Sequence, residues 1–229
     1  MSEGETRHTC TILAAEAVTH DVRRFVIEKP EGYRYEPGQA TEVSVAEPEW
    51  EDEGRPFTFT SLNTDANLEL TAKIYPEHDG VTKRMGELVV GDKLIVRDPW
   101  GAITYRGPGV FIAGGAGVTP FIAILRQLVA DGGLAGNTLI FSNPTSQDII
   151  LEGELRRMLG DRAVFTLTRE EPTPGLGHVQ GRIDEAMLRE YVSDFDRPFY
   201  VCGPPEMVEE LTGVLEELGA DPQNVVIEA

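Results

Sequence analysis

The chain of 229 residues carries 39 acidic and 20 basic side chains, which gives a formal net charge of −19 at pH 7. An acidic surface of this kind repels nucleic acid and anionic membranes, so charge excludes both classes of partner. The hydrophobic content of 41% can supply a core, and the length suits two modest domains or one large one.

Membrane insertion and inorganic redox centres are also disfavoured by the sequence. The apolar runs are far shorter than the roughly 20 residues needed to cross a bilayer, and the polar start MSEGETRHT lacks the apolar stretch of a secretory signal. We therefore expect a cytoplasmic location. The two cysteines, Cys10 and Cys202, cannot supply four ligands to an iron–sulfur cluster, so any redox cofactor is expected to be organic and no metal site is predicted.

Short β-rich segments, separated by Gly, Pro, Asn or Asp, fill the first half of the chain. This pattern predicts an antiparallel β-barrel domain over residues 1–103, with one helical turn at residues 80–88. The predicted strands are CTILAAEAV, VRRFVIEK, ATEVSVAE, FTFTSL, LELTAKIY and DKLIVRD.

Strands and helices alternate after DPWGAITYRGPG, residues 98–109, which we interpret as the boundary between two domains. Alternation predicts an α/β domain over residues 104–229, in which helices cover both faces of a doubly wound parallel sheet. The predicted strands are GVFIAG, NTLIFS, AVFTLT, PFYVCG and NVVIEA, and the predicted helices span residues 119–131, 151–159, 184–192 and 205–218.

The turn GGAG, residues 114–117, joins the buried strand VFIAG to a helix with proline in its first turn. Glycines in such a turn let backbone N–H groups approach a ligand, and a helix N-terminus favours phosphate. The segment is neither a P-loop, which needs Gly-Lys-Ser/Thr, nor a G-x-G-x-x-G motif, which needs glycine in place of Pro120. The alternative is a tight turn with no ligand.

Two further segments contain side chains and turns that are suited to binding a cofactor. RPFTFTS, residues 55–61, combines an arginine, an aromatic ring and a hydroxyl in the barrel half, and YVCGPPEM, residues 200–207, leads a strand into glycine and proline before a helix. Together with the glycine turn, these segments resemble the flavin, nicotinamide and Cys-Gly-Pro motifs of the ferredoxin–NADP reductase superfamily. The resemblance covers nearly the whole chain and implies a flavin-binding barrel followed by a nicotinamide nucleotide-binding domain.

The resemblance implies a set of flavin contacts in the barrel half. Arg55 matches the arginine that pairs with the flavin phosphates, unless it is merely a surface residue, and Phe57 stands where the family usually has tyrosine. Thr58 matches the serine whose hydroxyl lies near the flavin N5. The segment at residues 73–85 resembles the second flavin loop, for which a simple helix cap is the alternative. The implied flavin contacts are Arg55, Pro56, Phe57, Thr58, Lys73, Tyr75, Gly80, Val81 and Thr82.

The resemblance also implies contacts to the nicotinamide nucleotide. Cys202 matches a cysteine near the nicotinamide C4, with a small buried strand residue as the alternative, and Glu228 matches an acid near the active site. With Thr58, these two residues form the predicted catalytic set. The implied nucleotide contacts are Gly115, Gly117, Thr119 and Pro120 in the turn, and Cys202, Gly203 and Pro204 in the later segment.

Preference between NADPH and NADH depends on the segment TLTREE, residues 166–171. Thr168 and Arg169 resemble the Ser-Arg pair that grips a ribose 2′-phosphate, and Arg182 is a second candidate cation. These residues favour NADPH. The preference over NADH is small, because Pro144 and Thr145 stand where some relatives have a further basic residue.

The resemblance implies an oxidoreductase in which FAD, favoured over FMN, receives hydride from NAD(P)H and passes electrons to a separate acceptor such as ferredoxin or flavodoxin. Two alternatives stay open: a ferric-chelate or free-flavin reductase without a protein partner, and a non-catalytic flavoprotein subunit that relays electrons in a larger complex. Ala229 stands where many relatives have an aromatic residue against the flavin. Trp100 is a candidate replacement, and a plain packing role for Trp100 is the alternative.

Overall fold

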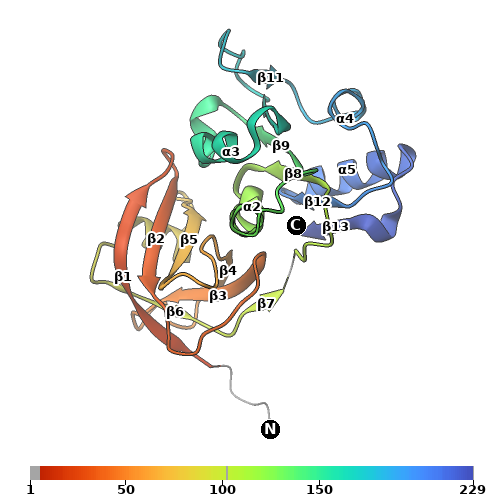
Figure 1. Ribbon diagram of the computed structural model, residues 1–229. Helices are drawn as coiled ribbons and strands as arrows, with labels where there is room; N and C mark the ends of the chain where they lie inside the picture. Colours follow the sequence, from red (N-terminus) through yellow and green to blue (C-terminus); the bar gives the residue numbers. More distant parts are fainter. Residues whose placement is uncertain (1–5, 102, 229) are drawn as a thin grey trace. The chain divides into compact units, whose positions relative to one another are not determined.

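The computed structural model describes residues 6–101 and 103–228, so the prediction about Ala229 lies outside the described residues. The chain divides into two compact units, Met1–Ala102 and Ile103–Ala229, each with its own sheet (Figure 1).

The first unit is a near-closed antiparallel β-barrel, which confirms the predicted fold of this half (Figure 1). Its elements are β1 His8–Ala17, β2 Val22–Glu28, β3 Gln39–Val45, β4 Arg55–Thr58, β5 Asn67–Lys73, α1 Val81–Glu87, β6 Lys93–Val96 and β7 Trp100–Gly101. The strand order is β4-β3-β6-β1-β2-β5, with β7 also paired to β3. A single bridge between Phe59 and Leu70 brings the chain beyond β4 back to β5 and nearly closes the barrel.

Alternation of apolar residues explains the interior of the barrel. Successive side chains in a strand point to opposite faces, so every second residue enters the core. Phe25 and Ile27 of β2 do so, as do Leu68 and Leu70 of β5. Other buried members of this core are Ile12, Val43, Val45, Phe59, Leu94 and Val96.

The second unit contains a wholly parallel sheet with the strand order β11-β10-β9-β8-β12-β13. Its strands are β8 Val110–Gly114, β9 Thr138–Asn143, β10 Ala163–Leu167, β11 His178–Gln180, β12 Phe199–Cys202 and β13 Val225–Glu228. Its α-helices are α2 Thr119–Ala130, α3 Glu152–Leu159, α4 Glu185–Tyr191 and α5 Pro205–Glu217. Short 3-10 helices span Gly115–Val118 (η1), Ser146–Asp148 (η2), Gly160–Arg162 (η3) and Pro222–Asn224 (η4).

Helices cover both faces of this sheet, which confirms the predicted doubly wound architecture (Figure 1). Val110 and Ile112 of β8 pack in one cluster with apolar residues of α4 and α5. On the other face, Phe111 lies against Phe121 of α2, with ring centroids 5.1 Å apart, and α3 contacts both α2 and β10. Within the part of the chain that the structure describes, no helix has the length and apolar character needed to span a bilayer.

Three local features differ from the sequence prediction. The strand predicted over FTFTSL ends at Thr58, because beyond it the chain is joined to β5 by the Phe59–Leu70 bridge. The two-residue strand β7 and the three-residue strand β11 were not predicted, since their extended form depends on pairing with β3 and β10. The glycine turn is the 3-10 helix η1, which leads directly into α2.

Candidate functional site

Arg55 opens β4 and leaves its guanidinium in solvent. The Nη1 group donates a hydrogen bond to the carbonyl of the preceding residue, Gly54, at 2.7 Å, and a carboxylate oxygen of Glu53 lies 3.9 Å away. Both side chains of this ion pair are more than half exposed, so the pair is weak. The guanidinium can therefore be drawn to a phosphate without breaking a strong contact.

Thr58, at the other end of β4, is buried, and its hydroxyl makes no hydrogen bond with any residue that the structure describes. Phe57 is half-buried and packs against the barrel core. In the sheet, Ala40 of β3 lies opposite both Thr58 and Trp100, so these two residues occupy one row on either side of it. Trp100 is 46% exposed, which leaves its indole available to a ligand.

The second predicted flavin loop follows β5. Lys73 ends this strand and forms an ion pair of 2.9 Å with Asp21. Burial opposes the charge of Asp21, but hydrogen bonds from Lys73 and Thr19 outweigh burial and lower the pKa of Asp21. Lys73 is thus held by a carboxylate, a contact that the sequence did not reveal.

The ring of Tyr75 stacks on that of His78, with centroids 5.5 Å apart and planes inclined by 12°. Tyr75 is 41% exposed, so the stacked pair presents an aromatic surface. Gly80 then precedes α1, in which Val81 is buried and Thr82 is half-buried. No acidic residue lies in the first turn of α1, so its amides are not already neutralised.

The glycine turn is built by contact between backbones. Gly117 lies so close to the end of β12 that an added Cβ would be 2.7 Å from the nitrogen of Gly203 and closer still to the carbonyl of Cys202. Gly114 likewise faces Met207 and Pro204, at 2.7 Å and 2.9 Å from a hypothetical Cβ. The sequence interpretation assigned the glycines to the approach of a ligand, but these two are required by packing against β12 and α5.

Gly115 is the glycine of this turn that needs a special conformation. Its φ of +52° is in the left-handed region, and an added Cβ would meet no atom within 4 Å. At the start of α2, the hydroxyl of Thr119 donates to the carbonyl of Ala116 at 3.0 Å, and Pro120 is buried. The structure therefore brings the predicted turn residues together with Cys202, Gly203 and Pro204.

Cys202 and Glu228 are paired in register at the carboxyl ends of β12 and β13. Burial, and then the charge of Glu228, raises the pKa of the Cys202 thiol to about 12, so the thiol is neutral at physiological pH. Burial also raises the pKa of Glu228, whose Oε2 atom is buried and has no hydrogen-bond partner among the described residues. A buried thiol and a half-buried carboxyl thus lie side by side, and the carboxyl can hold a proton.

The pKa of Glu228 predicts a pH-dependent effect on stability. A carboxyl whose pKa is raised in the folded state is destabilising once it ionises, and this cost disappears below its ordinary pKa of 4.5. Glu228→Gln is therefore expected to unfold at a higher temperature than the parent at pH 7 to 8, with the difference shrinking towards pH 4. Thermal unfolding across this range measures it, with Glu209→Gln on the exposed face of α5 as the control. A difference that did not change with pH would contradict the assignment.

Thr168 and Arg169 follow β10 and are tied to the end of β9. The amide of Thr168 donates to the carbonyl of Asn143 at 2.9 Å, and that of Arg169 donates to the carbonyl of Pro144 at 2.8 Å. Both side chains are exposed, and Arg169 makes no ion pair with any residue that the structure describes.

Arg182 follows the neighbouring strand, β11, and so lies at the same edge of the sheet, where the parallel strands have their carboxyl ends. Leu167 of β10 is paired with Gln180 of β11. Arg169 comes two residues after Leu167, and Arg182 comes two residues after Gln180. Arg182 is also exposed and forms no ion pair within the described ranges. The structure thus brings two available cations to one edge, where a phosphate can be held.

Two residues at this edge were not found by sequence reasoning. Asn143 is 2% exposed, and both of its amide atoms lack a hydrogen-bond partner among the described residues. Glu170 accepts hydrogen bonds from the amide and the hydroxyl of Ser146, at 2.7 Å and 3.0 Å. Asn and Glu are ordinary loop residues, so no local pattern could have distinguished them.

Comparison with known families assigns each unit. Residues 9–105 match the oxidoreductase FAD-binding domain, and residues 111–212 match the oxidoreductase NAD-binding domain. The predictions of FAD and a nicotinamide nucleotide as cofactors are therefore confirmed at the level of the domain family.

Curated relatives are reductases. The ferredoxin–NAD(P)(+) reductase component of the naphthalene 1,2-dioxygenase system of Pseudomonas putida is 27% identical over 226 residues, covering 96% of this chain and 67% of that protein. NADH-cytochrome b5 reductase 1 of Mortierella alpina is 32% identical over 187 residues, covering 76% of this chain and 62% of that protein. The chain therefore spans only part of the length of these relatives.

Among solved structures, a ferredoxin NADP+ reductase from Neisseria gonorrhoeae with bound FAD and NADP superposes with a TM-score of 0.83. The match covers 97% of this chain and 98% of that one at 20% identity. At this identity, the likeness supports the fold of the chain.

Proposed function

The chain belongs to the ferredoxin–NADP reductase superfamily, and from that premise we propose that it is an NAD(P)H-dependent flavin oxidoreductase. In this proposal, hydride passes from the nicotinamide nucleotide to FAD, and electrons then leave for a separate acceptor. The observation that carries the proposal is the presence of an FAD-binding and an NAD-binding domain in one chain, each with its motif residues at strand ends.

The barrel residues fit a flavin. Arg55 offers a planar donor fork whose polar partners, among the residues that the structure describes, are its own neighbours Gly54 and Glu53, and such a fork suits a phosphate. Val81 and Thr82 add backbone amides at the start of a helix without acidic residues in its first turn. We assign flavin contact also to Pro56, Phe57, Lys73, Tyr75 and Gly80, and we assign the role of an aromatic cover to Trp100.

The proposed reaction requires little chemistry from the side chains themselves. FAD supplies, when bound, the ability to accept a hydride and to release single electrons. Thr58 contributes a hydroxyl that makes no competing hydrogen bond within the described ranges, and Cys202 contributes a neutral thiol that adds no negative charge beside the nicotinamide. Glu228 can hold a proton at a higher pH than an ordinary glutamate. The contribution of the chain is mainly to position the two cofactors.

NADPH is the proposed donor, because Arg169 and Arg182 lie at one edge of the sheet and neither is in an ion pair with a described residue. A ribose 2′-phosphate is held best by several charges. The carboxylate of Glu170, one residue from Arg169, opposes this preference, but it already accepts two hydrogen bonds from Ser146.

Arg169→Ala is expected to raise the KM for NADPH by the equivalent of about 1.5–3 kcal/mol, the range for a hydrogen bond to a charged group. The KM for NADH should change little, because NADH has no 2′-phosphate. Steady-state kinetics with both nucleotides measure the effect, and Arg157→Ala, on the exposed face of α3, is the matched control. Equal losses for both nucleotides would assign Arg169 to a shared part of the cofactor or to folding.

The acceptor is proposed to be a separate one-electron carrier protein. Two relatives are named as reductases of ferredoxin and of cytochrome b5, which are carriers of this kind. We favour ferredoxin or flavodoxin, and the alternatives are a small acceptor such as a ferric chelate or free flavin, and a relay role in a larger complex.

Turnover by the isolated chain separates these alternatives. With FAD bound, the purified protein is expected to reduce ferricyanide at the expense of NAD(P)H without any partner protein. Added ferredoxin or flavodoxin should then be reduced faster than ferric citrate or free FMN. A chain that retains FAD but fails to reduce ferricyanide would be a relay subunit, and a preference for ferric citrate or free FMN would remove the carrier protein from the proposal.

A further inference from the structure

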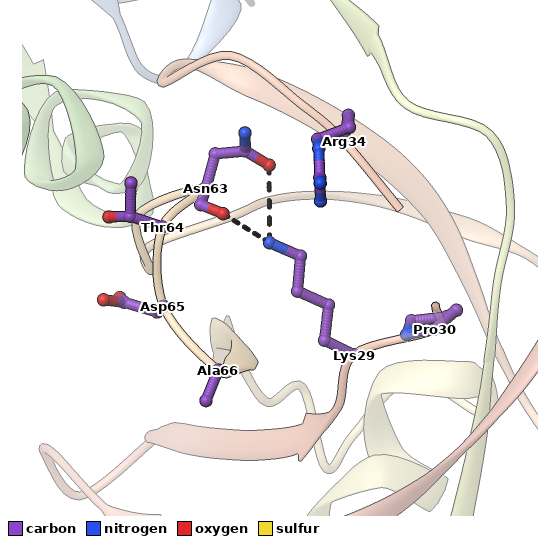
Figure 2. Close-up of a pocket in the computed structure, with 7 residues that line it drawn as sticks. All are labelled: Lys29, Pro30, Arg34, Asn63, Thr64, Asp65 and Ala66. Carbon is purple, nitrogen blue, oxygen red and sulfur yellow. Dashed lines mark hydrogen bonds between the residues drawn. The ribbon is translucent and has the colours of Figure 1, made fainter. Parts of the chain in front are cut away.

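A hollow on the barrel unit concentrates positive charge in a chain that is otherwise strongly acidic. It has a volume of about 470 Å³, within the range of small-molecule sites, and it lies between the segment after β2 and the loop before β5. Figure 2 shows its lining residues, which are Lys29, Pro30, Arg34, Asn63, Thr64, Asp65 and Ala66. We call this hollow the Lys29–Arg34 pocket.

The pocket is far from the flavin loop. Strands β2 and β5 are paired along their length. Val22 pairs with Lys73 at one end, and Glu28 pairs with Asn67 at the other. Six residue steps at about 3.4 Å each separate these ends by about 20 Å. Lys73 and the flavin loop lie at the first end, whereas the lining residues directly follow Glu28 or directly precede Asn67. None of the proposed cofactor contacts lines the Lys29–Arg34 pocket, which is therefore unassigned.

Two cations meet in this pocket without a carboxylate partner. Neither Lys29 nor Arg34 forms an ion pair with any residue that the structure describes. Lys29 instead donates to the carbonyl of Asn63 at 2.5 Å and to its side-chain oxygen at 3.4 Å (Figure 2). Arg34 donates to the carbonyl of Tyr33 at 3.2 Å and is exposed. Burial, and then the charge of Arg34, lowers the pKa of Lys29, and the charge of Asp65 opposes this shift without outweighing it.

Asn63 holds Lys29 in place. Its Oδ1 atom accepts hydrogen bonds from the amide of Tyr35, at 3.2 Å, and from Lys29. This fixes the side-chain amide so that its NH2 group points away from Lys29, as Figure 2 shows. The NH2 group has no hydrogen-bond partner within the described residues. The hydroxyl of Thr64 lines the same hollow.

Asp65 is the carboxylate of the lining, and it is engaged elsewhere. Its Oδ2 atom accepts a hydrogen bond from the amide of Leu62 at 2.8 Å, and Figure 2 shows the side chain turned away from Lys29. The donors of the pocket therefore exceed its acceptors, and an oxyanion would satisfy them. We propose that the Lys29–Arg34 pocket binds a small solute through its phosphate or carboxylate group, independently of the nucleotide cofactors.

Calorimetric titration with inorganic phosphate tests this proposal. The protein is first saturated with FAD and NADP+, so that all cofactor phosphates, including the ribose 2′-phosphate, occupy their own sites, and ionic strength is held constant with chloride. Saturable binding is expected, and Arg34→Gln should weaken it by roughly tenfold or more, the effect of losing a hydrogen bond to a charged group. Asp65→Asn should tighten binding, because it removes a negative charge from the lining.

Lys93→Gln is the matched control, since it removes an exposed cation from the same unit at the start of β6. It should leave phosphate affinity unchanged. A second titration with succinate separates the two sources of the oxyanion: binding of phosphate alone assigns a phosphorylated solute, and binding of succinate alone assigns a carboxylate. Absence of saturable binding of either anion to the parent, or equal affinity in the parent and Arg34→Gln, would overturn the proposal.

Discussion

Gly117→Ala is expected to lower the free energy of unfolding by about 1–3 kcal/mol, the range of overpacked core substitutions. The added Cβ would lie 2.7 Å from the nitrogen of Gly203 and still closer to the carbonyl of Cys202, so the obstacle is backbone that cannot move as a side chain can. The turn would have to separate from β12, which also displaces Cys202. Denaturant unfolding measures the loss of stability, and weaker binding of NAD(P)H should accompany it.

Gly213→Ala provides the control for this prediction. Gly213 lies within α5, is exposed, and would have no atom within 4 Å of an added Cβ. Because alanine has the higher helix propensity, this substitution should stabilise the chain by about 0.5–1 kcal/mol. Equal effects of the two substitutions would contradict the close approach of η1 to the end of β12.

Arg55→Ala is expected to weaken FAD binding by about one to two powers of ten, since each charge-assisted hydrogen bond contributes about 1.5–3 kcal/mol. Stability without FAD should change little, because the polar partners of the exposed guanidinium among the described residues are only Gly54 and Glu53. Flavin fluorescence during titration of the apoprotein measures the affinity. Arg34→Ala, which removes an exposed arginine from the far end of the barrel unit, should retain full affinity. Full FAD occupancy in Arg55→Ala would remove Arg55 from the site.

The strands and helices with strong periodicity could be predicted from the sequence, because their burial pattern is local. Alternation in VRRFVIEK predicts β2, and the apolar run VFIAG predicts the buried strand β8. Strands β7 and β11 could not be predicted, because two or three residues carry no period and pairing partners impose their conformation.

The candidate site shows the same division between local and tertiary information. A glycine-rich turn at the end of a strand is visible in the sequence, but contact of Gly117 with β12 depends on the fold. The ion pair between Lys73 and Asp21 joins residues 52 positions apart. The buried amide of Asn143 is likewise recognised by its surroundings rather than by its neighbours in the sequence.

Anaerobic absorbance spectroscopy tests the central claim most directly. The purified chain, loaded with FAD, is mixed first with NADPH and in a separate experiment with NADH. The proposed function predicts a bound flavin whose visible absorbance band bleaches on addition of nucleotide, faster with NADPH than with NADH. A chain that takes up no FAD, or whose bound flavin stays oxidised with both nucleotides, would contradict the proposed oxidoreductase.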